Sequence, residues 1–256
     1  MKILHSNIIG EFGRDIFIIH GFLGMGDNWK SHANQIAKKN FKVHLIDLRN
    51  HGKSFWSDKF NFDLMVDDIY NYASYHNIDR FSLIGHSMGG NISMLFAQKF
   101  PELLEKIIII DILPKQYKPH HENILKSLKS IDFEKMNTRK DVDIHMSTFI
   151  EDERVRQFLL KNLYWINKER LGLKLNINVL FEFKDKLSIN LSQDLKFNKP
   201  SVFIYGDNSP YVDESDLTML NLYFSDIEII KVPFSGHWVH ADNPSFFLEK
   251  TIKFLN

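Results

Sequence analysis

Short apolar segments recur along the chain and predict the strands of a buried sheet. Each segment is continuously apolar or β-branched instead of alternating with polar residues, which is typical of strands covered on both faces. These segments are Ile16–Ile19, Val43–Ile46, Phe81–Ile84, Ile107–Ile110, Val202–Tyr205 and Ile227–Val232.

Amphipathic segments with helical spacing lie between these apolar runs. They are Asn28–Lys39, Leu64–His76, Gly90–Lys99, Ser215–Leu222 and Pro244–Phe254. Strands that alternate with helices predict right-handed crossovers, and therefore an α/β fold with a mostly parallel central sheet and helices on both faces. In such sheets ligands bind at the carboxyl ends of the strands, so the residues after each strand are the first candidates for a site.

The interval 113–194 breaks this alternation because it holds no convincing core strand. An interval of this length is too long for a structureless loop in a compact domain. Its helical segments are Glu122–Ser130, Arg139–Phe149 and Glu153–Leu163. We therefore expect a helical cap over 113–194, inserted after the strand at 107–110, on a core formed by 1–112 and 195–256.

Charge and cysteine content narrow the classes of function. Lysine plus arginine and aspartate plus glutamate each number 32, so the formal net charge is +0 and nucleic acid is not expected as a partner. The absence of cysteine excludes a thiolate nucleophile, disulfides and cysteine-ligated metals. The 12 histidines show no His-Glu-x-x-His grouping. We expect neither a metal nor a cofactor.

The distribution of apolar residues also bears on location. The N-terminal residues lack the apolar region of a signal peptide, and no apolar run approaches the ~18 residues that span a bilayer. We therefore expect a cytoplasmic protein without integral membrane association. The sequence leaves the oligomeric state open.

A Gly-x-Ser-x-Gly pattern, Gly85-His86-Ser87-Met88-Gly89, directly follows the apolar run Phe81–Ile84. Between a strand and a helix this pattern predicts a nucleophile elbow, a strained turn that exposes a serine hydroxyl. Gly85 and Gly89 lie where a Cβ atom would clash as the strand and the helix fold back on each other. Ser87 is the candidate nucleophile, and it needs a neighbouring base to take its proton.

Three further strand ends carry patterned residues, so that four motifs follow in order. The others are His20-Gly21-Phe22-Leu23-Gly24, Asp47-Leu48-Arg49-Asn50-His51-Gly52-Lys53-Ser54 and Gly236-His237-Trp238-Val239-His240-Ala241. With these motifs the sequence resembles the α/β-hydrolase superfamily from about Ile16 to the C-terminus. Within it, the chain is most similar to bacterial YbfF-type esterases, which share these motifs and also the motif Gly-x-Asn-Ser-Pro-Tyr-Val.

His237 is the expected general base, because the chain order in this fold is serine, acid, histidine. His240 comes from the same loop, but the match to the family places it outside the triad. His86 is interpreted as a structural residue on the opposite side of the turn from Ser87. By resemblance, His20 braces the loop that stabilises the oxyanion.

The acid is the open member of the triad. Most of the superfamily carries it as Gly-x-x-Asp after the strand matching Val202–Tyr205, where this chain has Ser209. Asp111 directly follows the strand Ile107–Ile110, at a position where some members of the superfamily place the acid. Asp111 is therefore preferred, and Asp207 and Asp213 are kept as alternatives. A buried carboxylate there would orient His237 and stabilise its imidazolium.

The oxyanion formed during attack needs two preorganised N–H donors. The amide of Met88 supplies one at the N-terminus of the following helix, where the dipole favours negative charge. By resemblance, the amide of Phe22 supplies the second. Phe22, Trp165 and Trp238 are also expected to contact the substrate.

These residues predict a serine hydrolase that cleaves a small-molecule carboxylic ester or acyl thioester, and the family resemblance extends this to acyl-CoA. The same triad also performs C–C bond hydrolysis and cofactor-free perhydrolysis. A ligand-binding protein on a hydrolase scaffold is the alternative from another class, because a fold does not by itself fix a function.

Overall fold

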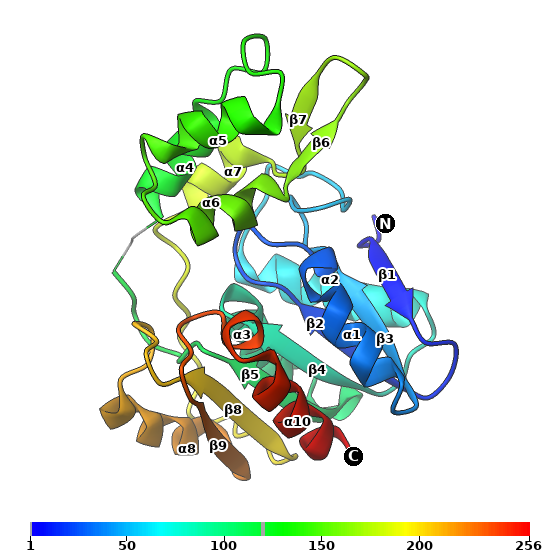
Figure 1. Cartoon of the computed structure of the whole chain (residues 1–256). Helices are drawn as coiled ribbons and strands as arrows, with labels where there is room; N and C mark the ends of the chain where they lie inside the picture. The colour runs from blue at the N-terminus through cyan, green and yellow to red at the C-terminus, as the bar shows by residue number, and fades with distance from the viewer. Residues whose placement is uncertain (1, 119–120) are drawn as a thin grey trace.

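A seven-stranded sheet forms the centre of the computed structural model, which describes residues 2–118 and 121–256 (Figure 1). Its strand order is β1-β3-β2-β4-β5-β8-β9. Only β1 among these strands runs antiparallel to its neighbour, and the mostly parallel sheet that the sequence predicts is confirmed. The strands are β1 (Ser6–Ile9), β2 (Arg14–Ile19), β3 (Phe41–Ile46), β4 (Phe81–His86), β5 (Leu104–Ile110), β8 (Ser201–Gly206) and β9 (Ile227–Val232).

Helices cover both faces of the sheet. Successive strand residues point to opposite faces, so alternate residues of one strand pack against different helices. Ile16 and Ile18 of β2 pack with α1 (Lys30–Ala37) and α10 (Pro244–Leu255). Phe17 and Ile19 of the same strand belong to the cluster formed with α2 (Phe62–Tyr75) and α3 (Met88–Lys99). None of the helices in the described part of the chain combines the length and apolar character needed to cross a membrane.

Strand β1 is the element of the sheet that the sequence pattern did not predict. It has only 4 residues, and its side chains are partly or fully exposed at the edge of the sheet. A short edge strand shows no continuous apolar run, because only one of its sides is paired and its faces are incompletely covered.

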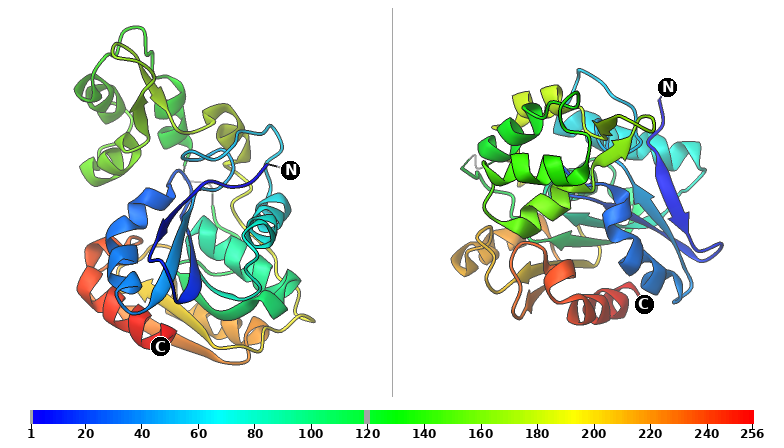
Figure 2. Two further views of the ribbon diagram at one scale, coloured as in Figure 1. Left: turned by 90° about the vertical axis from the view of Figure 1, so that its right-hand side faces the viewer. Right: turned by 45° about the horizontal axis from the view of Figure 1, so that its top comes forward.

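The chain between β5 and β8 forms a separate layer over one end of the sheet (Figures 1 and 2). The three helices expected there are present, and a fourth helix and a two-stranded hairpin accompany them. These elements are α4 (Glu122–Lys129), α5 (Arg139–Ser147), α6 (Glu153–Leu160), β6 (Leu163–Trp165), β7 (Leu171–Leu173) and α7 (Ile177–Phe183). They fall within the expected cap range, whose boundaries stay a prediction. Met1 and residues 119–120 of the expected core and cap lie outside the described residues.

The cap and one face of the sheet bury apolar side chains in one continuous cluster. Leu125 of α4 and Leu159 of α6 belong to the same cluster as Leu83 of β4 and Phe203 of β8. Full burial of such a side chain contributes roughly 1.5–3 kcal/mol. The cap is therefore packed as part of the same core.

Candidate active site

Ser87 forms a one-residue turn between β4, which ends at His86, and α3, which begins at Met88. Its backbone lies at φ 54° and ψ −120°, a conformation that costs a non-glycine residue about 1–3 kcal/mol. A Cβ atom at Gly85 would lie 2.2 Å from the carbonyl oxygen of Gly89. The glycines therefore permit the close approach of strand and helix, as the sequence pattern predicts.

The His237 ring is hydrogen-bonded to a buried carboxylate. Its Nδ1 lies 2.7 Å from Oδ2 of Asp111, and it donates, since a carboxylate only accepts. The carboxylate also accepts hydrogen bonds from the Gly206 amide at 2.9 Å and from Ser209 Oγ at 2.5 Å. Burial raises the pKa of Asp111 to about 6, and the hydrogen bonds from Ser209 and Gly206 lower it.

The two alternative acids hold other parts of the backbone. Asp207 accepts hydrogen bonds from the amides of Phe234 and Ser235 at 3.0 and 2.9 Å. Asp213 caps the short helix Glu214–Met219 and accepts a hydrogen bond from the Ser215 amide. In both groups these hydrogen bonds lower the pKa. The structure thus brings Asp111, and neither alternative, to Nδ1 of His237.

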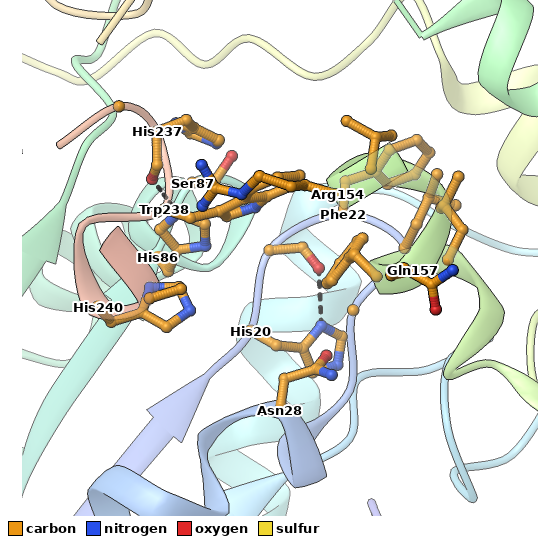
Figure 3. Close-up of a pocket in the computed structure, with 18 of the residues that line it drawn as sticks. His20, Phe22, Asn28, His86, Ser87, Arg154, Gln157, His237, Trp238 and His240 are labelled. Carbon is orange, nitrogen blue, oxygen red and sulfur yellow. Dashed lines mark hydrogen bonds between the residues drawn. The ribbon is translucent and has the colours of Figure 1, made fainter. Parts of the chain in front are cut away.

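Two aromatic neighbours fix the position of His237 beside Ser87 (Figure 3). The Tyr211 ring is stacked on the His237 ring, with 3.9 Å between their centroids. His86 donates from Nε2 to the His237 carbonyl oxygen at 2.9 Å, and burial lowers the pKa of His86 to about 3. The contact of Tyr211 with His237 was not inferred from the sequence, although Tyr211 belongs to the Gly-x-Asn-Ser-Pro-Tyr-Val motif.

The other histidine of this loop, His240, is buried and lies on the side of His86 that faces away from Ser87 in Figure 3. Its ring stacks on Trp29 with 4.0 Å between the centroids. Burial lowers its pKa well below the usual value. This position agrees with a packing role.

The turn after β2 contains Phe22, the expected second donor of the oxyanion hole. The amides of the next three residues are paired: Leu23 with His51 Nε2 at 3.3 Å, Gly24 with the Gly21 carbonyl at 3.0 Å, and Met25 with Asn28 Oδ1 at 2.9 Å. The hydrogen bonds between described residues include none donated by the amides of Phe22 or Met88. The absence of a protein acceptor for these two amides is consistent with the expected role of oxyanion donors.

Two neutral histidines, His20 and His51, hold this turn through hydrogen bonds. His20 donates from Nδ1 to the Gly21 carbonyl at 2.8 Å and accepts at Nε2 from the Leu48 amide at 3.1 Å. Burial lowers the pKa of His20 to about 4 and that of His51 to about 3. A neutral imidazole has one donor and one acceptor nitrogen, which is the combination each position requires.

The Asp47–Ser54 motif, interpreted as a turn-shaping segment, is anchored by buried polar contacts. Asp47 accepts from the Gly26 and Lys53 amides at 2.7 and 2.8 Å. Arg49 forms a two-point ion pair with Asp68, at 2.5 and 2.7 Å. Through His51, this segment also holds the amide of Leu23.

A cavity of about 790 Å³ opens beside Ser87, His237 and Phe22. Further apolar lining comes from Leu23 and Trp29 after β2, from the cap, from the loop after β8 and from the His237 loop. The last three regions contribute Ile124, Val155, Phe158, Leu159, Tyr211 and Trp238. The described residues contain no group of three or more His, Asp or Glu side chains that could hold a metal ion.

Trp165, which was expected to contact the substrate, does not line this cavity. It lies on the β6–β7 hairpin and is 56% exposed. Trp165 shares a face of β6 with the buried Leu163, but it is the last residue of the strand and lies next to the connecting loop, where its ring is left exposed. Trp238 does line the cavity, where its ring contacts Phe158 with 5.5 Å between the centroids.

A parallel sheet with a serine elbow after β4 and a buried carboxylate against a histidine is the architecture of an α/β hydrolase. The sequence profile described as "alpha/beta hydrolase fold" matches residues 16–244, and the chain belongs to this family.

Several relatives are similar over almost the whole chain. Esterase YbfF of Escherichia coli (strain K12) is 29% identical over 242 residues, which cover 94% of this chain and 92% of that protein. The sn-1-specific diacylglycerol lipase ABHD11 of Mus musculus is 31% identical over 247 residues, covering 94% and 80%. A solved structure of a marine microorganism esterase has a TM-score of 0.94 at 33% identity, covering 99% and 100%. The resemblance to YbfF-type esterases is thereby confirmed, and these relatives support an enzyme that hydrolyses carboxylic esters.

Proposed function

We propose that this protein is a serine hydrolase that cleaves small-molecule carboxylic esters or acyl thioesters through an acyl-enzyme on Ser87. The observation that carries the proposal is the 2.7 Å hydrogen bond from His237 Nδ1 to the buried carboxylate of Asp111, beside a strained serine that opens into a cavity. A histidine that donates from Nδ1 keeps Nε2 unprotonated, as a general base requires.

Acylation follows from this arrangement. As Ser87 Oγ attacks the carbonyl carbon, His237 Nε2 takes the hydroxyl proton and Asp111 stabilises the imidazolium. The amides of Phe22 and Met88 donate to the oxyanion, and α3 adds the favourable end of its dipole at Met88. His237 then transfers the proton to the departing alcohol or thiol, which leaves the acyl group on Ser87.

Deacylation repeats these steps with water as the nucleophile. His237 takes a proton from water, the hydroxide attacks the acyl carbon, and the Ser87 oxygen leaves with the proton returned by His237. The carboxylic acid is the second product. This mechanism needs no cofactor, and Ser87, His237 and Phe22 line the cavity.

The cavity supports a small substrate with an apolar acyl or alcohol part. Its volume of about 790 Å³ is within the range typical of small-molecule sites. Phe22, Phe158 and Trp238 supply apolar surface close to Ser87. Part of this lining comes from α6 of the cap, so the cap is proposed to set the acyl length that fits.

Chemical labelling tests whether Ser87 is a nucleophile. A fluorophosphonate probe should modify the wild-type protein at Ser87, and Ser87→Ala should abolish the labelling. A panel of p-nitrophenyl esters and acyl-CoAs of graded length, with Ser87→Ala as the blank, would then rank esters against thioesters. Ligand binding without labelling or turnover would support the alternative of a binding protein instead. Turnover confined to cleavage of a C–C bond, or to formation of a peracid from a carboxylic acid and hydrogen peroxide, would support the other two alternatives.

A further inference from the structure

A hydrogen bond from the cap reaches the turn that carries Phe22. Asn162 follows α6 and directly precedes β6, and its side-chain Nδ2 donates to the Leu23 carbonyl oxygen at 2.9 Å. Asn162 is 1% exposed, so this contact is shielded from water. It connects two residues that are 139 positions apart in the sequence.

Leu23 has a backbone conformation that must be held in place. Its φ is 62°, in the left-handed region that a leucine rarely occupies. Such conformations persist where the surrounding structure over-determines them, and they gather at functional sites. Leu23 is held at both of its polar groups, because His51 accepts from its amide and Asn162 donates to its carbonyl.

The position of Asn162 is itself fixed by its neighbours. Its amide donates to the Leu159 carbonyl at 3.0 Å, and its carbonyl accepts from the Lys174 amide at 2.9 Å. Its Nδ2 makes a second hydrogen bond to Leu159 at 3.2 Å. The cap thus presents a preset donor to the turn.

The side-chain oxygen of Asn162 destabilises the folded state. Its Oδ1 is buried and has no hydrogen-bond partner within the described residues. A buried acceptor without a partner destabilises the folded state, and an apolar side chain of the same size would avoid this cost. Against this cost stand the two hydrogen bonds that Nδ2 donates, and one of them, to Leu23, reaches the turn that carries Phe22.

We propose that Asn162 is a positioning residue for the oxyanion hole. By fixing the Leu23 carbonyl, it holds the turn in the shape that directs the Phe22 amide into the cavity. The cap then contributes to catalysis as well as to the substrate pocket. This inference rests on the proposed hydrolase function, in which Phe22 is an oxyanion donor.

Asn162→Leu is the first test, because it removes the donor and also the unpaired Oδ1. We expect kcat for a p-nitrophenyl ester to fall about 10-fold while KM stays within about twofold. This loss is smaller than the roughly 10²–10³-fold cost of deleting an oxyanion donor, since the Phe22 amide is displaced and not removed. The thermal midpoint should stay level or fall slightly, because the variant removes the unpaired Oδ1 but leaves the Leu23 carbonyl without its donor.

Asn176→Leu is the matched control. Asn176 is another cap asparagine whose Nδ2 bonds to the core, in this case to Asn50 Oδ1 at 3.1 Å, and not to the turn that carries Phe22 and Leu23. We expect its kcat to stay within about twofold of wild type. An equal loss of kcat in both variants would overturn the proposal, because any cap–core hydrogen bond would then have the same effect.

A transition-state analogue separates positioning from packing. A trifluoromethyl ketone adds to the serine and places an oxyanion in the hole, whereas the carboxylic acid product does not. Asn162→Leu should weaken binding of the ketone by the same factor by which it lowers kcat/KM. The affinity for the carboxylic acid product should not change. Asn162→Asp, which has the same size but lacks the donor, should lose at least as much and serves if the leucine variant does not fold. A kcat within twofold of wild type in either folded variant would overturn the proposal.

Fluorophosphonate labelling keeps the two proposals distinguishable. If wild-type Ser87 is not labelled, the hydrolase function fails, whatever Asn162 does. If Asn162→Leu is labelled completely and at the wild-type rate, the proposed hydrolase function is supported and the proposed role of Asn162 fails.

Discussion

Ser209 donates its hydroxyl to Oδ2 of Asp111 at 2.5 Å, although the two residues follow different strands, β8 and β5. Ser209 occupies the place where most α/β hydrolases carry the acid. In this chain that place holds a donor, and the carboxylate reaches it from the neighbouring strand. The two adjacent strand ends therefore share one task, in which β5 supplies the charge and β8 orients it.

Replacing Asp111 by asparagine should lower kcat by roughly 10²–10⁴-fold, because the histidine would lose the partner that sets its tautomer. Asp207→Asn and Asp213→Asn should leave kcat within about threefold of wild type, since both carboxylates bond to backbone amides elsewhere. Steady-state kinetics on one ester compares the three. Near-normal turnover in Asp111→Asn with collapse in Asp207→Asn would reverse the assignment.

Removing the Ser209 hydroxyl should change the pH dependence of the enzyme. The hydrogen bond from Ser209 favours the charged form of Asp111 and lowers its pKa, so Ser209→Ala should raise that pKa further. The acidic limb of the kcat/KM profile should then move to higher pH, with a larger loss at pH 6 than at pH 8. Ser215→Ala, which removes a hydroxyl bonded to Asp213, is the control and should leave the profile in place.

Acid should destabilise the fold below about pH 6.5. Burial lowers the pKa of His20 to about 4 and those of His51 and His86 to about 3. Between these values and 6.5 the unfolded chain binds more protons than the folded one. Each histidine therefore removes about 1.4 kcal/mol of stability per pH unit as the pH falls through this window. Asp111, whose pKa is raised, acts in the opposite direction and offsets part of the effect.

Thermal unfolding between pH 8 and pH 5 checks this expectation. The midpoint should be nearly level above pH 7 and fall increasingly steeply below pH 6.5. His51→Gln removes one titrating group and should make that fall shallower than in wild type. The same pH slope in both proteins would show that His51 does not titrate in this window.

Trp238 and Trp165 should differ sharply on substitution. Trp238→Ala removes a ring that lines the cavity beside His237 and should raise KM for an apolar ester by about 10-fold, through lost apolar contact. Trp165→Ala changes an exposed hairpin residue and should leave KM within about twofold. An equal rise of KM in the two variants would indicate that Trp165 contacts the substrate.

Six of the seven strands of the central sheet, the elbow and the preferred acid could be predicted because they depend on local patterns. A continuous apolar run identifies a buried strand, and chain order places the residue after it at the ligand-binding edge, as for Ser87 and Asp111. The sequence did not show that Trp165 would be exposed and outside the cavity lining, because an aromatic residue in a cap has no periodicity that tells which side it faces.

The contacts of Asn162 and Tyr211 could not be predicted, since each depends on how distant segments pack. Asn162 meets Leu23 only because α6 ends above the turn after β2. Tyr211 meets His237 only because the loops after β8 and β9 run side by side. A motif can single out such a residue, as Gly-x-Asn-Ser-Pro-Tyr-Val does for Tyr211, but it does not predict which residue it contacts.

The single hydrophobic cluster shared by the cap and the sheet limits how this enzyme can be engineered. Excising the cap to admit larger substrates would expose side chains such as Leu125 and Leu159, and would also remove the contact from Asn162 to the turn. A truncated core is therefore expected to aggregate, and not to become a broader catalyst. Remodelling of the substrate range should proceed by replacing individual cavity side chains, such as Phe158, while the cap scaffold is left intact.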